Sequence, residues 1–99
     1  MKIIKKLVDE IAEEIEGAKD YAETAAEHKM NGEMAKAAKY KEMAHDELRH
    51  AEILHSFVKE EIEKASKVFT PPVSMMEEWQ NSHRRYIEHA AWIKQMLEM

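Results

Sequence analysis

Apolar side chains recur every three or four residues through two long segments of this 99-residue chain. That spacing places them along one face of an α-helix, so it predicts two long amphipathic helices. The positions on these two stripes are Ile4, Leu7, Ile11, Glu14, Ala18, Tyr21, Ala25 and His28 in the first segment, and Ala37, Tyr40, Ala44, Glu47, Ala51, Leu54 and Val58 in the second.

Each stripe contains one glutamate, Glu14 in the first and Glu47 in the second. A buried carboxylate is costly unless a cation or hydrogen bonds compensate it. His50 follows Glu47 by three residues, so the two side chains share one helix face and can reach one ion. Glu52 and His55 repeat this spacing, but Glu52 lies away from the stripe and we set that pair aside. The pattern points to a metal site.

The dipeptide Asn31-Gly32 separates the two segments, and it is typical of a helix end followed by a turn. If the helices fold back about this point, residues equally distant from it lie level. Glu14 then faces Glu47, and Tyr21 faces Tyr40. The hairpin is therefore expected to bring both stripe glutamates to one height.

A third segment follows the break at Thr70-Pro71-Pro72. Ser74 with Glu77 three residues later resembles a capping box, which predicts that a helix begins there. We expect one all-α domain over 1–99, with helices over about 3–30, 33–67 and 75–97. The stripe of the third helix is Met76, Trp79, His83, Tyr86, Ala90, Ile93 and Leu97, suited to packing across the hairpin or against a partner subunit.

Composition narrows the function classes. The net charge of −5 and the scattered basic residues argue against a nucleic-acid partner. The absence of cysteine excludes disulfides, thiolate metal sites and a cysteine nucleophile. No segment reads as a signal peptide or a membrane span, so we expect a cytoplasmic protein without a membrane partner. A long hairpin leaves apolar surface uncovered, which predicts a homodimer or a higher homo-oligomer.

Two copies of the chain would supply four glutamates and two histidines. That is the ligand set of di-iron carboxylate bundles, in which two helices give one Glu each and two give Glu-x-x-His. The expectation is a site at a dimer interface, with Glu14, Glu47 and His50 from both chains holding two iron ions per dimer. Manganese suits the same ligands, and zinc is an alternative.

The stretches Glu14-Ile-Glu-Gly-Ala-Lys-Asp-Tyr21 and Ala44-His-Asp-Glu47-Leu-Arg-His50-Ala51-Glu52 resemble one half of a rubrerythrin, in the ferritin-like superfamily. The resemblance covers roughly residues 1–65. It implies that Glu14 and His50 are terminal ligands, that Glu47 bridges the metals, and that Tyr21 hydrogen-bonds around them. It also implies oxidation of iron by oxygen or peroxide, or reduction of peroxide or oxygen, in a ferritin-like four-helix bundle formed by two chains.

The chain departs from rubrerythrins because it has two such helices instead of four and no cysteine for an iron–sulfur module. It is also similar to the two-helix encapsulated ferritins, which complete their metal site across a subunit interface. Two alternatives stay open. One is a metal-free helical oligomer with a structural or interaction role, in which Glu14 and Glu47 pair with Lys or Arg and set the register. The other is metal storage without turnover.

Overall fold

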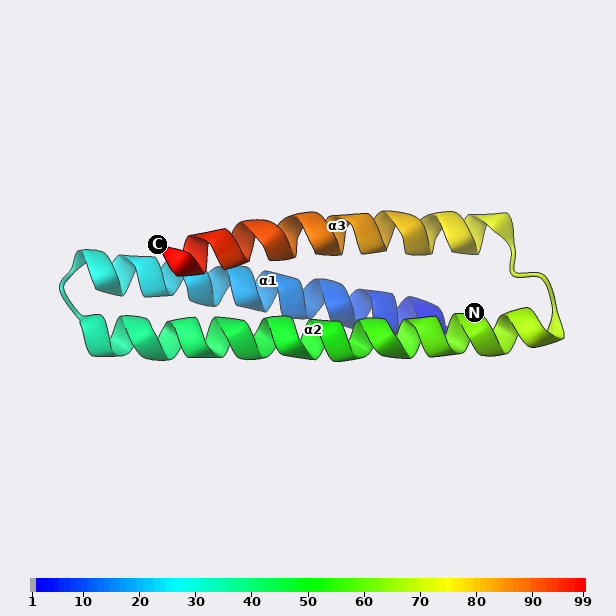
Figure 1. Cartoon of the computed structure of the whole chain (residues 1–99), viewed down its shortest axis with the longest axis horizontal. Helices are drawn as coiled ribbons and strands as arrows, with labels where there is room; N and C mark the ends of the chain where they lie inside the picture. The colour runs from blue at the N-terminus through cyan, green and yellow to red at the C-terminus, as the bar shows by residue number, and fades with distance from the viewer. Residues whose placement is uncertain (1) are drawn as a thin grey trace.

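The computed structural model describes residues 2–99 as three helices, 56 Å along the longest axis and about 17 Å across (Figure 1). Each helix runs antiparallel to the one before it, so the first and third helices run in the same direction. Helix α1 spans Lys2–Met30, α2 spans Met34–Val68 and α3 spans Val73–Glu98. Charged side chains interrupt the apolar residues of every helix. None of the three helices is both long enough and apolar enough to cross a membrane.

The turn between α1 and α2 lies at the predicted dipeptide. Gly32 has a φ angle of +77°, a left-handed conformation that glycine adopts without a steric penalty. The amide of Glu33 donates to the carbonyl of His28 at 2.9 Å, and that of Gly32 donates to Lys29 at 3.1 Å. These two bonds form a Schellman motif, which satisfies the last carbonyls of α1 and reverses the chain.

The start of α3 differs from the prediction. Ser74 lies inside the first turn, and no side chain caps the helix. The flanking residue is Pro72, with a φ angle of −58°, and its carbonyl accepts the amides of Met75 and Met76 at 3.1 and 3.2 Å. The predicted capping box is therefore wrong, because the proline carbonyl opens the helix before Ser74 can act as a cap.

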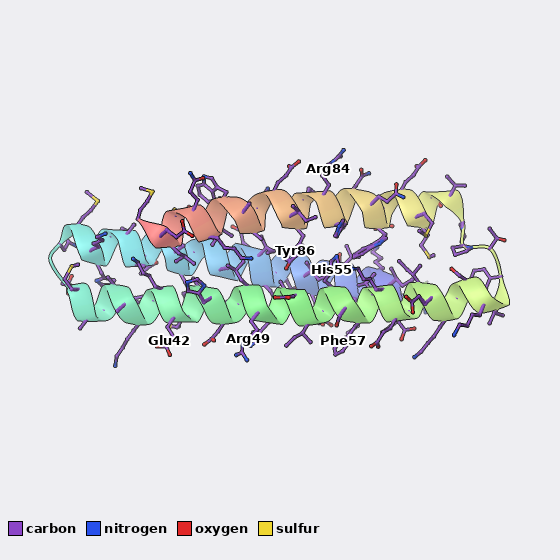
Figure 2. The ribbon with its side chains drawn as sticks, in the orientation of Figure 1. Glu42, Arg49, His55, Phe57, Arg84 and Tyr86 are labelled. Carbon is purple, nitrogen blue, oxygen red and sulfur yellow. The ribbon has the colours of Figure 1, made fainter. Side chains whose placement is uncertain are left out.

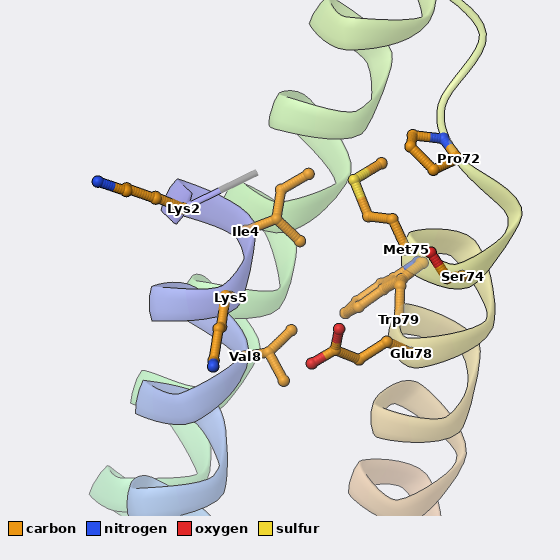
Figure 3. A pocket seen from close by; sticks show the side chains of 9 residues that line it. All are labelled: Lys2, Ile4, Lys5, Val8, Pro72, Ser74, Met75, Glu78 and Trp79. Atoms are coloured by element: carbon orange, nitrogen blue, oxygen red, sulfur yellow. The ribbon is translucent and has the colours of Figure 1, made fainter.

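Helix α3 packs mainly against α1 and covers one side of the hairpin. Figure 3 shows the beginning of this contact, where Ile4 and Val8 of α1 face Met75 and Trp79 of α3. Because both hairpin helices touch α3 as well as each other, their buried faces are wider than the predicted stripes. The buried residues outside those stripes are Val8, Ile15, Ala22, Leu48, His55 and Ala65.

Candidate metal centre

Glu14 of α1 and Glu47 and His50 of α2 converge midway along the hairpin. One ligand atom from each lies within 4.8 Å of the others. His50 Nδ1 is 3.5 Å from Glu14 Oε2 and 3.9 Å from Glu47 Oε1. The turn at Gly32 sets this register, so the structure brings together the three residues that the sequence singled out.

The Glu14 carboxylate is incompletely satisfied. Its Oε2 atom is buried and has no hydrogen-bond partner among the residues that the structure describes. The side chains of Glu14 and Glu47 are only 27 % and 26 % exposed, whereas that of His50 is 46 % exposed. A native structure rarely leaves such an oxygen unpaired, and a cation held between these side chains would satisfy it.

The Glu14 and Glu47 carboxyl groups lie so close together that ionisation of one disfavours ionisation of the other. Hydrogen bonding with the Glu14 carboxyl, followed by burial, raises the pKa of Glu47 to about 7. Two neighbouring carboxylates disfavour double ionisation, so the Glu47 carboxyl keeps its proton to a higher pH than an isolated glutamate does. A divalent cation supplies a compensating positive charge, and the donor set of two oxygens and one imidazole suits iron, manganese or zinc.

Gly17, one turn after Glu14, leaves room for the Glu47 carboxylate. A Cβ atom at this position would lie 3.0 Å from Glu47 Oε2, tighter than an ordinary van der Waals contact. The absence of a side chain at Gly17 therefore helps to determine where the Glu47 carboxylate lies.

The cluster opens on the side of the hairpin that α3 does not cover. Met43, His50 and Phe57 are seven residues apart and form one row on α2, and all three are exposed. Figure 2 shows Phe57 on the side of α2 away from α3, whereas His55 and Tyr86 lie between the two helices. We call this uncovered side the outer face; its members are Ile3, Glu10, Gly17, Met43, His50 and Phe57.

Tyr21 and Tyr40 lie level across the hairpin, as the symmetry about the turn predicts, with ring centroids 6.1 Å apart. His28 stacks on Tyr40 at 5.3 Å. Within residues 2–99, the Tyr21 hydroxyl makes no hydrogen bond to Glu14 or Glu47. A hydrogen-bonding role for Tyr21 around a metal therefore stays a prediction.

A second polar pair lies between α2 and α3, where sequence reasoning expected packing alone. His55 is buried and hydrogen-bonds His83, although its motif partner Glu52 is exposed as predicted. The available signal was the spacing of Leu48, His55 and Ile62, seven residues apart, which forms a second row on α2 beside the predicted stripe.

Comparisons of the chain with models of known protein families, with curated proteins and with solved structures gave no match.

Proposed function

We propose that two copies of this chain associate through their outer faces into a ferritin-like four-helix bundle that binds a pair of metal ions. The observation that carries the proposal is the buried Glu14 Oε2, which has no hydrogen-bond partner among the described residues, beside Glu47 and His50. Three ligands from one chain form half of a di-metal carboxylate site, and a second copy supplies the other half. Exposed Met43 and Phe57 on either side of His50 give the second copy an apolar surface to cover.

Glu14, Glu47 and His50 of both chains would hold two iron ions per dimer, with manganese or zinc as alternatives. A redox-active metal bound here would carry the electrons that move when iron is oxidised or when oxygen or peroxide is reduced. The chain's own residues have separate tasks. Glu47 gives up its proton as the metal charge arrives, and His50 offers a neutral imidazole nitrogen to the metal. The apolar side chains around the carboxylates limit the access of water.

Metal analysis of protein purified from iron-replete medium tests this proposal. We expect about one transition-metal ion per chain and a dimer or larger species in light scattering. Glu47→Ala and His50→Ala should each lose most of the metal. Glu52→Ala is the matched control, because it removes the glutamate of the other Glu-x-x-His motif and should keep the metal.

Less than about half an equivalent of metal per chain, unchanged by Glu47→Ala, would count against the metal centre. In that case the exposed outer face favours the second candidate, a metal-free helical oligomer with a structural or interaction role. Melting curves separate the two, since chelation lowers the melting temperature only where metal binds the folded protein. Ferroxidase and peroxidase assays on iron-loaded protein distinguish turnover from storage.

A further inference from the structure

The contact between α2 and α3 contains two histidines that the metal centre does not use. His55 is only 9 % exposed, and its Nε2 shares a hydrogen bond with Nδ1 of His83. The rings of Trp79 and Tyr86 pack around it, with centroids 4.9 and 5.4 Å from that of His55. His55 and Tyr86 are seen between the two helices in Figure 2. A titratable pair thus occupies a position where side chains hold α3 to α2.

We propose that His55 and His83 form a pH-sensitive latch, which keeps α3 on the hairpin while at least one ring is neutral and releases it when both are protonated. A hydrogen bond between two imidazoles needs one N–H donor and one nitrogen lone pair. With both rings protonated, two donors and two positive charges would meet in a largely buried contact. Double protonation therefore removes the bond and adds repulsion.

The surroundings offer little to stabilise a second positive charge. On α2, Lys59 lies one turn after His55 and Glu52 almost one turn before it, and Glu52 is exposed. Burial, then the charges of His83 and Lys59, lower the pKa of His55, while Glu52 alone opposes them. On α3, burial raises the pKa of Tyr86, which keeps that hydroxyl neutral.

Helix α1 faces this region with both apolar and acidic side chains. Val8 and Ile11 line a cavity that Tyr86 also lines. Negative and positive charges both occur around that cavity, and none of these groups is among the causes of the His55 pKa shift. The charged or titratable side chains at that cavity, apart from Tyr86, are Asp9, Glu16, Glu78, Arg85 and His89.

The direction of the pH effect follows from the pKa of His55. That pKa is lowered in the folded protein, so release of α3 takes up a proton. The docked state is fully stable above the ordinary pKa of about 6.5 and loses stability as the pH falls below it. Because release takes up one proton, the ratio of released to docked protein changes by up to about tenfold per pH unit. Release would uncover apolar side chains of α1 that face α3, including Val8 and Ile11.

Amide hydrogen exchange, resolved for each helix, tests the latch. It is measured at about pH 7.5 and about pH 5 with a chelator present, and the rates are corrected for the effect of pH on intrinsic exchange. We expect α3 to open on the order of tenfold or more at the lower pH relative to the α1–α2 hairpin. His55→Phe keeps an aromatic ring against Trp79 and cannot titrate, so its α3 should open equally at both pH values. His89→Gln changes an exposed histidine on α3 and should behave like the wild type.

If His55→Phe does not fold, His83→Gln serves instead, because it keeps hydrogen-bonding groups beside His55 and removes one charge. A weaker pH dependence of α3 exchange in that variant supports the latch. Three results would overturn the latch. One is α3 exchange in the wild type that does not change with pH, and another is a substituted protein whose α3 exchange depends on pH as strongly as that of the wild type. The third is a hairpin that opens together with α3. The measurement is made without metal, so it stands apart from the proposed metal centre.

Discussion

At the scale of single residues, the candidate site depends on a proton as much as on its ligands. The Glu47 carboxyl shares a space with Glu14, and one proton relieves the repulsion that two carboxylates would create. Gly17 gives the Glu47 carboxylate the room it needs. The paired acids and the buried Glu14 oxygen without a hydrogen-bond partner both favour occupation of the site by a cation.

The pKa of Glu47 predicts how metal-free protein responds to pH. Because this pKa is raised from 4.5 to about 7, the folded state binds more protons than the unfolded state between these values. Its contribution to the free energy of unfolding is complete below about pH 4.5 and is lost as the pH rises through about 7. We expect a loss of about 1 to 2 kcal/mol, allowing for solvent screening of a side chain that is one quarter exposed.

Urea unfolding of metal-free protein between about pH 5 and pH 8 measures this loss. Glu47→Gln stays neutral throughout the range, so its stability should lack this dependence. A wild type and a Glu47→Gln variant with parallel pH profiles would contradict the assignment of the raised pKa to this pair.

Gly17→Ala should separate stability from metal binding. Alanine favours the helix by about 0.5 to 1 kcal/mol over glycine, so metal-free protein should gain up to that amount. The new Cβ, 3.0 Å from the present position of Glu47 Oε2, must displace that carboxylate. We expect metal affinity to fall on the order of tenfold or more, measured by competition with a chelator. Unchanged affinity would show that Glu47 binds no metal from this position.

At the scale of helices, the turn fixes the register on which the site depends. Gly32 has a positive φ angle, and a Cβ there would meet nothing within 4 Å. Gly32→Ala should therefore cost about 1 to 2 kcal/mol through backbone strain alone, measured by thermal unfolding. Gly32→Asn is the matched variant and should cost less, because asparagine tolerates this conformation better. Equal losses in both variants would argue against backbone strain as the cause.

The hairpin and the Glu14–Glu47–His50 cluster were predictable because helical period and turn position are local properties that agree with each other. The third helix was predictable as an element, whereas the residues of the hairpin that it packs against were not. Leu48 and His55 lie beside the predicted stripe of α2 and are buried, and the Tyr86 ring of α3 covers His55. A single stripe cannot reveal a second packing neighbour, and so the contact between His55 and His83 emerges only in three dimensions.

At the scale of the whole molecule, the two sides of the hairpin have different surroundings. One side is covered by α3, and the other presents the outer face, with the cluster of Glu14, Glu47 and His50 midway along it. A single chain leaves Met43 and Phe57 exposed beside His50. We therefore expect the oligomer to depend on this face, and Phe57→Glu should raise the dimer dissociation constant by a factor on the order of ten or more, measured by sedimentation. Ile87→Glu, on α3, is the matched control for an exposed apolar residue and should leave the dimer intact.

The most direct measurement is a crystal structure of iron-loaded protein with an anomalous-scattering map around Glu47. We expect two metal peaks between two chains, with Glu14, Glu47 and His50 of both chains as ligands. A map without peaks at these residues in protein that contains iron would contradict a di-metal site shared between two chains, and so would a metal held entirely within one chain.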